Sequence, residues 1–404
     1  MNGFPLLRFG ALSAILLSPA MSYAAPEPAP PVERLVMLMR HGVRSPLDGE
    51  VPHATRTGQP WPRWAAPAEQ VTPHGAAALR ALAKADRRWF AAAGLVRGTG
   101  CLGATVRLWT NSSPRTIASG EAYAAGFSPS CALEVGHRPE GTNDPLFEPL
   151  GAHPKTFDAD RAIESINRYT HGAEALARRH AVGLKLLEQV LACPAGPCSP
   201  VEPSTVQASA DGHGIDLKGP IRAASGTAQV LMLQYLEGMP LARVGWGRAT
   251  PARLEVLGAV HGALFDVFSR PPYMAAFQMA PTVDCITQDL TATTAPKVDV
   301  LIGHDTNVAA LAAVLGVDVK APGFATNDPA PGGGIAIALV RAPDGSSAVR
   351  LWYRSQSAAD MRTARDRTVW TPLRLRGCDE GAEHRCALPR FLQRLADATA
   401  PARG

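Results

Sequence analysis

A short, unbroken apolar run near the start of the chain ends abruptly in a cluster of charged and polar residues. The run covers residues 35–39, and Arg40, His41, Gly42 and Arg44 follow it. An apolar run of this length predicts a strand that is buried on both faces, as in the sheets of α/β proteins. Because open α/β sheets bind ligands where their strands end, we expect the polar cluster to contact a ligand.

The residue types in this cluster suit an anionic ligand and a covalent step. Arg40 and Arg44 offer forked donors that match phosphate or carboxylate oxygens, and His41 between them can act as a nucleophile. Gly42 allows the backbone to approach a ligand closely. An ordinary strand exit with solvated arginines would explain an isolated Arg-His-Gly triplet. The second arginine and the proline at position 46 make that explanation the weaker one.

Apolar periodicity outlines alternating strands and helices, which is the pattern of an α/β fold. Thr72 and Pro73 suit the N-cap and the first turn of one predicted helix. The glycines at 332–334 lack the Lys-Ser/Thr of a P-loop, so they predict a turn. The predicted strands are 35–39, 106–110, 298–302, 335–340 and 349–353, and the predicted helices are 73–90, 117–125, 161–191, 223–237, 251–268, 308–315 and the tail after 388.

Two further positions suit an anion or a proton transfer. Arg115 follows a predicted strand and lies near a helix start, where free N–H groups favour an anion, although an exposed arginine explains it equally well. His304 and Asp305 follow the strand at 298–302, just as the first cluster follows its own strand. Asp305 or Thr306 could nevertheless serve only as a helix N-cap.

The segment 40–46 (Arg-His-Gly-Val-Arg-Ser-Pro) resembles the signature of the histidine acid phosphatases, the larger branch of the histidine phosphatase superfamily. The similarity continues in chain order at 71–75, 115–126, 144–147 and 303–307. It implies an α/β fold with a mixed sheet flanked by helices, similar to phosphoglycerate mutase, and an inserted, mostly helical domain.

The resemblance also implies a role for each candidate residue. His41 would attack phosphorus to form a phosphohistidine, and Asp305 would protonate the leaving oxygen. Weaker substrate-binding candidates are Thr306 and Arg248, which lies in a segment similar to one of the phytases but could equally be a surface arginine. The residues implied to hold the phosphoryl oxygens are Arg40, Arg44, Arg115 and His304.

The first 25 residues have the pattern of a secretory signal peptide. Arg8 is the only charge, an apolar stretch follows it, and small residues precede a cleavage site after Ala24 or Ala25. The apolar stretch is too short to span a bilayer, and no later stretch is apolar enough to do so. We therefore predict a periplasmic or secreted protein without a membrane anchor after cleavage.

Seven cysteines fit an oxidising compartment, although the residues alone leave their connectivity open. Their pattern is similar to that of the bacterial periplasmic phytases within the family. This similarity leaves Cys285 as a buried free thiol with no reactive or metal role. The pairs that it implies are Cys101–Cys131, Cys193–Cys198 and Cys378–Cys386.

Length and composition describe a globular chain of two domains, or of one domain with a large insertion. The 404 residues are 46% hydrophobic and 19% charged, with a formal net charge of +5. The sequence contains no Lys/Arg tract of the kind that binds nucleic acid. It also contains no CxxC or HExxH motif, so we predict neither a metal nor another cofactor. We predict a monomer with an α/β catalytic domain (26–150 plus 285–404), a helical domain inserted at 151–284, and a pocket for a small phosphate ester between them.

The substrate is less constrained than the chemistry. The segment 303–307 favours a phytase, but Asp48 lies where phytases carry a lysine that helps to bind a highly anionic ligand. Arg56, Arg63 or Arg248 could compensate for Asp48. We predict a broad acid phosphomonoesterase with phytate as the leading substrate. The alternatives are a glucose-1-phosphatase, or an exported protein that binds phosphate or a sugar phosphate without turnover; the export signal argues against a mutase.

Overall fold

The computed structural model describes residues 31–98, 101–103, 105–199, 202–378 and 383–403. The predicted signal peptide lies outside the described residues. A mixed sheet runs through the centre in the strand order β10-β8-β7-β1-β6-β2-β3, with β9 added beside β8. The strands are β1 (Arg34–Arg40), β2 (Val106–Thr110), β3 (Val135–His137), β6 (Val298–Gly303), β7 (Gly334–Arg341), β8 (Ser347–Ser355), β9 (Val369–Leu373) and β10 (Cys386–Ala387).

The centre of this sheet brings the predicted strands together. β1, β6, β2 and β3 are parallel to one another, whereas β7 pairs with β1 in the antiparallel sense and starts an antiparallel half. All six residues of β6 are buried, and so are the last six residues of β1. This is the mixed sheet that was predicted, and its apolar runs are buried on both faces.

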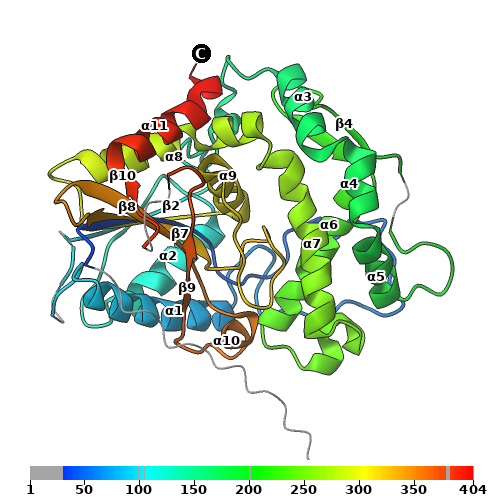
Figure 1. The fold of residues 1–404 in the computed structure, drawn as a ribbon. Helices are drawn as coiled ribbons and strands as arrows, with labels where there is room; N and C mark the ends of the chain where they lie inside the picture. Colours follow the sequence, from blue (N-terminus) through cyan, green and yellow to red (C-terminus); the bar gives the residue numbers. More distant parts are fainter. Residues whose placement is uncertain (1–30, 99–100, 104, 200–201, 379–382, 404) are drawn as a thin grey trace, which may run out of the picture.

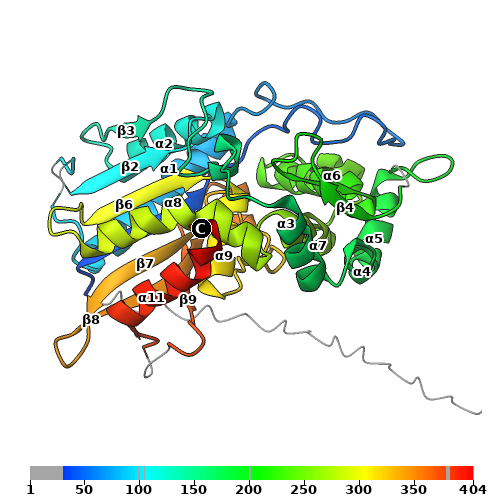
Figure 2. The ribbon, with the colours of Figure 1, turned by 90° about the horizontal axis from the view of Figure 1, so that it is seen from above.

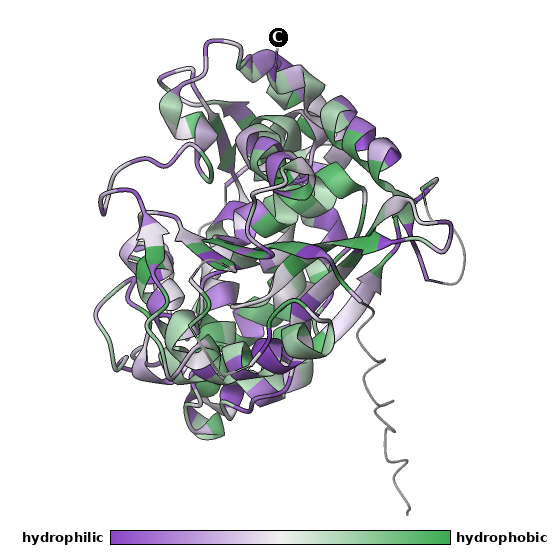
Figure 3. Cartoon of the chain, turned by 90° about the vertical axis from the view of Figure 1, so that its left-hand side faces the viewer, coloured by the Kyte–Doolittle hydropathy of each residue, from purple (hydrophilic) through white to green (hydrophobic). Residues whose placement is uncertain are grey.

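Helices cover both faces of the sheet. Figure 1 shows α1 (Pro73–Ala92) and α2 (Pro114–Phe127) below it, and α8 (Pro272–Thr291), α9 (Asp305–Leu315) and α11 (Leu388–Thr399) above it. Figure 3, in which the ribbon is coloured by hydropathy, shows mainly hydrophobic strands at the centre and many hydrophilic residues on the outer helices. Thr72 caps α1 as predicted, because its hydroxyl accepts a hydrogen bond from the Gly75 N–H.

The middle of the chain forms a group of helices beside the sheet, which Figures 1 and 2 show in green. One apolar cluster joins it to the sheet, since Leu231, Leu257, Leu311 and Leu301 belong to the same buried core. The division at 151–284 stays a proposal, and α8 crosses residue 284. The elements are α3 (Ala159–Thr170), α4 (Ala173–Arg179), α5 (Ala181–Leu191), β4 (Thr205–Ala208), β5 (Ile215–Lys218), α6 (Pro220–Leu236) and α7 (Pro251–Phe268).

Some local predictions were wrong. The helix predicted at 161–191 is broken into three. The first break comes where His171 is left-handed (φ 59°) and Gly172 follows it with φ 91°, and the second comes at His180 (φ −99°, ψ 12°). The helix α8 and the hairpin β4–β5 were not predicted. Short turns of helix complete the described structure at η1 (Pro149–Ala152), η2 (Leu241–Gly247), α10 (Ala358–Arg362) and η3 (Ala400–Ala402).

The three implied disulfides are all present, so six of the seven cysteines are paired. Such bonds are consistent with export to an oxidising compartment. Cys285 is free, as predicted, but it is half-buried rather than buried. Burial, together with Asp289 and Asp299, raises the pKa of its thiol to about 12, which agrees with an unreactive thiol. Within the described part of the chain, none of the helices is long and apolar enough to cross a membrane.

Candidate active site

The ends of β1 and β6 lie side by side at one edge of the sheet. Arg40 is in register with Gly303, and the His41 N–H donates a hydrogen bond of 2.8 Å to the Gly303 carbonyl. The polar segments that follow the two strands are therefore neighbours, although they are more than 250 residues apart in the sequence. The carboxyl ends of parallel strands are the places where α/β folds bind ligands.

His41 is almost fully buried and is oriented by its own backbone. Its Nδ1 lies 2.9 Å from the Gly42 carbonyl, so we assign the hydrogen to Nδ1 and a free lone pair to Nε2. Burial, and then Arg40 and Arg44, hold the pKa of His41 well below its ordinary value. The ring is therefore neutral, which is the form that can act as a nucleophile.

Arg40 carries a buried guanidinium with an unused donor. Its Nη2 lies 2.8 Å from an Asp305 carboxylate oxygen, and its Nη1 donates to the Pro329 carbonyl at 2.7 Å. Its Nε–H has no hydrogen-bond partner among the described residues. A buried donor without a partner costs about 1–3 kcal/mol, so the arrangement favours a ligand that accepts this hydrogen bond.

Arg44 is held in a similar way by Glu50. The two terminal nitrogens of Arg44 lie 2.7 and 3.0 Å from the two Glu50 oxygens, which is a bidentate contact. The Nε of Arg44 is also buried and has no partner within the described chain. Only 8% of the Glu50 side chain is exposed, so this carboxylate fixes the direction in which Arg44 can donate.

Glycine 226 of α6 allows the Glu50 segment to lie against that helix. A Cβ at this position would lie 1.9 Å from the Glu50 carbonyl oxygen, so Gly226→Ala must push the segment away. We expect a loss of about 1–3 kcal/mol in the free energy of unfolding, measured in urea, with a fall in phosphatase activity as Arg44 loses its partner. Gly103→Ala, where an added Cβ meets no atom within 4 Å, is the matched control and should change neither. If the two variants had the same free energy of unfolding and the same phosphatase activity, this account would be contradicted.

Arg115 and His304 complete the cluster. An Arg115 terminal nitrogen lies 3.5 Å from His304 Nδ1, and His304 Nε2 lies 3.1 Å from the amide oxygen of Asn111. Burial and then Arg115 lower the pKa of His304 to about 3, so its ring is neutral and donates from Nε2 to Asn111. Ser119 of α2 ties this side to the His41 loop, since its hydroxyl accepts from the Gly42 N–H at 3.0 Å.

Comparisons with known proteins identify the family. Residues 31–171 match the model described as the histidine phosphatase superfamily (branch 2). Phytase AppA of Escherichia coli is 30% identical over 96% of both chains, and the glucose-1-phosphatase of Salmonella typhimurium is 29% identical over 96% of this chain and 97% of its own. The chain is a branch 2 histidine phosphatase.

The same likeness holds for the three-dimensional structure. The Hafnia alvei phytase in complex with tartrate superposes with a TM-score of 0.84 at 26% identity, over 94% of this chain and 99% of that one. The phytase from Citrobacter braakii gives 0.81, also at 26% identity. These matches confirm the predicted family and its α/β fold. They also confirm the prediction of a histidine acid phosphatase, a class of enzyme that hydrolyses phosphate monoesters.

In this branch 2 histidine phosphatase, a histidine from the helical group, His261, also lowers the pKa of Asp305. His261 of α7 is buried and lies 2.8 Å from an Asp328 oxygen. Burial raises the pKa of Asp305, but Arg40, and then His261 with His41 and His304, outweigh it and hold that pKa below its ordinary value. Sequence reasoning missed His261, because a single histidine on an apolar helix carries no signal of its own.

The two weaker substrate-binding candidates, Thr306 and Arg248, differ in their position relative to the cluster. The N–H of Thr306 donates to an Asp305 oxygen at 2.9 Å, so Thr306 adjoins the cluster through its backbone. Arg248 donates to the Val190 carbonyl at 2.7 Å and lies over the ring of Trp246. No contact among the described residues joins Arg248 to the other candidates. The structure therefore brings together Arg40, His41, Arg44, Arg115, His304, Asp305 and Thr306, and leaves Arg248 apart.

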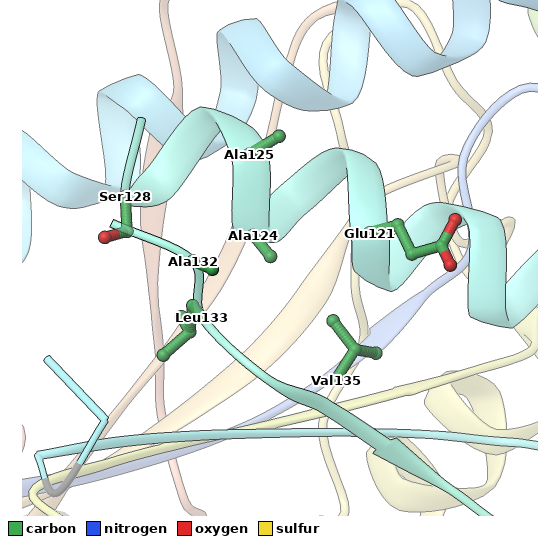
Figure 4. A pocket seen from close by; sticks show the side chains of 7 residues that line it. All are labelled: Glu121, Ala124, Ala125, Ser128, Ala132, Leu133 and Val135. Carbon is green, nitrogen blue, oxygen red and sulfur yellow. The ribbon is translucent and has the colours of Figure 1, made fainter. Parts of the chain in front are cut away.

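Two features elsewhere do not add to this site. Cys285, Asp289 and Asp299 form a group that could ligate a metal, but an Arg107 terminal nitrogen already lies 3.3, 3.1 and 2.5 Å from them. That guanidinium pairs with both carboxylates and offsets one of their two negative charges. A cavity of about 360 Å³ lies between α2 and the segment 128–135, and Figure 4 shows that its lining is mostly small and apolar, with Glu121 at one side. It includes none of the candidate residues.

Proposed function

We propose that the chain is an exported acid phosphomonoesterase that works through a phosphohistidine at His41. The observation that carries this proposal is the pair of buried Nε–H donors on Arg40 and Arg44, on either side of a neutral histidine. Neither donor has a hydrogen-bond partner in the part of the chain that the structure describes. Two such donors suit the oxygens of a phosphoryl group. Arg115 is proposed to bind the same group, and His304 is proposed to do so when its Nε2–H turns from Asn111 to a phosphoryl oxygen. We further propose a monomer that does not bind nucleic acid.

The proposed reaction has two balanced steps. In the first, His41 Nε2 forms a bond to phosphorus, the bond to the ester oxygen breaks, and Asp305 gives its proton to that oxygen. In the second, a water attacks the phosphohistidine, Asp305 takes a proton from the water, and the bond to Nε2 breaks to release phosphate. The three arginines stabilise the charge on the phosphoryl oxygens throughout, as phosphoryl transfer requires.

The proton on Asp305 must come from outside the free enzyme, since the low pKa of this carboxyl leaves it ionised. A phosphate monoester loses its second proton at about pH 6, so below that pH the bound ester itself brings a proton. The ester also draws Arg40 away from Asp305 and repels its negative charge. Both effects favour protonation of Asp305 in the complex.

Activity should therefore depend on pH in a defined direction. We expect kcat/KM for an alkyl phosphate to fall as the pH rises through about 6, because the monoanionic ester disappears. It should persist well below that pH, because the lowered pKa of His41 keeps the nucleophile unprotonated. A pH–rate profile measures this, with stability followed in parallel as the control. An optimum at neutral or alkaline pH would contradict the proposed proton source.

Phytate is the leading candidate substrate, since relatives that match over most of the chain are named phytases. A sugar phosphatase is the second candidate, because another relative is named a glucose-1-phosphatase and Asp48 adds a negative charge after the Arg44 segment. Thr306 and Arg248 stay candidate substrate contacts. The third candidate, a binding protein without turnover, needs neither a nucleophile nor a proton donor.

Phosphate release by the purified, oxidised mature protein tests these alternatives. Phytate, glucose 1-phosphate and an aryl phosphate are offered at acidic pH without added metal. Turnover of the esters supports the enzyme, and the ranking of kcat/KM decides between a phytase and a sugar phosphatase. If the protein binds phosphate tightly but releases phosphate from none of the esters, the enzyme proposal is wrong and the binding-protein alternative is supported.

A further inference from the structure

Two half-exposed carboxylates lie beside the buried cluster. A Glu69 oxygen is 3.5 Å from an Arg115 terminal nitrogen, and 42% of the Glu69 side chain is exposed. A Glu148 oxygen is 3.8 Å from His304 Nε2, and 44% of that side chain is exposed. By contrast, the Arg40 side chain is 1% exposed. Glu69 and Glu148, which we call the acidic rim, therefore lie between the buried cluster and the solvent.

The backbone of Glu69 gives a second, independent indication. Its φ is 68°, in the left-handed region that glycine adopts freely and that costs other residues about 1–2 kcal/mol. Its N–H donates to the Pro46 carbonyl at 2.9 Å, which fixes it in the loop that follows Arg44. A strained residue with a charged side chain next to a site points to a role for that side chain.

The rim changes the charge balance of the whole site. The pKa of His304 is lowered to about 3 by burial and Arg115, so the histidine adds no positive charge above that pH. Burial and Arg44 lower the pKa of Arg115, while Glu69, Asp305 and Glu148 act in the opposite direction. The contacts set three arginines, Arg40, Arg44 and Arg115, against four carboxylates, Asp305, Glu50, Glu69 and Glu148. A site of this kind has no excess positive charge for a polyanion.

We propose that Glu69 and Glu148 determine substrate specificity by charge, favouring esters with one phosphate group over esters with several. The inference rests on the proposed phosphomonoesterase activity and concerns the class of ester that it accepts: it ranks esters with one phosphate group above phytate, the reverse of the order that the names of the relatives suggest. The first phosphate meets the buried donors of Arg40 and Arg44, whereas further phosphate groups must lie toward the solvent and the rim carboxylates. Glu50 differs from the rim, because it is buried and bidentate and so orients Arg44.

A charge series at position 69 tests the proposal. The wild type, Glu69→Gln and Glu69→Lys place a charge of −1, 0 and +1 on one backbone. We expect the ratio of kcat/KM for phytate to that for an aryl phosphate to rise about threefold to tenfold at each step, near pH 6 and at low salt. Glu148→Gln should raise the ratio by a similar single step. The control is Glu164→Gln, which removes a surface carboxylate paired with Arg168 on α3 and should leave the ratio unchanged.

The outcomes separate charge selection from simple positioning of Arg115. If Glu69 only positions Arg115, both substrates lose activity by the same factor and the ratio stays constant, which would overturn the proposal. Added salt should reduce the change in the ratio, since exposed charges are screened. If the wild type hydrolyses no ester, the proposed function fails. Phytate affinity across the same series, measured by calorimetry, then tests the acidic rim separately. An affinity that rises along the series supports charge selection by the rim, and a constant affinity contradicts it.

Discussion

Replacement of His41 by alanine is expected to lower kcat/KM for every phosphate ester by at least about four orders of magnitude. The variant loses the only group proposed to form the covalent intermediate, and no protonation of the leaving group can replace that bond. Arg40 and Arg44 stay in place, so phosphate should still bind. Initial rates with aryl and alkyl esters measure the loss, and calorimetry with inorganic phosphate measures the binding that remains.

The loss must be distinguished from misfolding and from a different nucleophile. His137→Ala removes an exposed histidine at the edge strand β3 and should leave both rate and stability unchanged. Thermal unfolding of His41→Ala should stay close to that of the wild type, because among the described residues the ring's hydrogen bond goes to the adjacent Gly42 carbonyl. Turnover within about tenfold of the wild type would show that another residue attacks phosphorus.

The core of the site was predictable because its residues follow strands. Arg40 and His41 end one buried apolar run, His304 and Asp305 end another, and parallel pairing places both ends at one edge. The pattern placed each pair of residues at the end of a strand, whereas the expectation that the two pairs share one site came from the family resemblance. Asn111, which directly follows β2 and contacts His304, could have been found by the same reasoning.

The partners of the site residues could not be predicted in this way. Glu50 and Glu69 lie in a loop without periodicity, and only tertiary packing brings them to Arg44 and Arg115. His261 reaches Asp328 from a helix whose other residues are mainly apolar. Each of these contacts depends on how a segment packs, which local pattern does not encode.

The helix that was not predicted, and the helix that was predicted to continue too far, both have local causes. The helix α8 contains Pro281 and begins with Pro272, and an internal proline usually ends a helix because its ring clashes with the preceding turn. Packing against α9 and α11 supports α8 (Figure 1). The break at His171 and Gly172 is the opposite case, because the turn residues stop a helix that the apolar periodicity continues.

Asp305→Asn should separate esters by their leaving group. For an alkyl phosphate such as phytate or glucose 1-phosphate we expect kcat/KM to fall about 10²- to 10⁴-fold, the usual contribution of a general acid. For a nitrophenyl phosphate the fall should be about tenfold or less, since a stabilised phenolate leaves with little protonation. Steady-state rates with the two esters measure the difference, and Asp216→Asn on the exposed side of β5 is the matched control.

The same substitution has a second consequence that a damaged fold would not produce. Arg40 loses its ionised partner at 2.8 Å, so its guanidinium becomes free to bind phosphate more tightly. Asp305→Asn should therefore bind inorganic phosphate more strongly than the wild type while it hydrolyses alkyl esters far more slowly. Weaker binding together with slower hydrolysis of both esters would mean that Asp305 only maintains the local structure. Slower hydrolysis with tighter binding requires a carboxyl that both supplies the proton and competes with the substrate for Arg40.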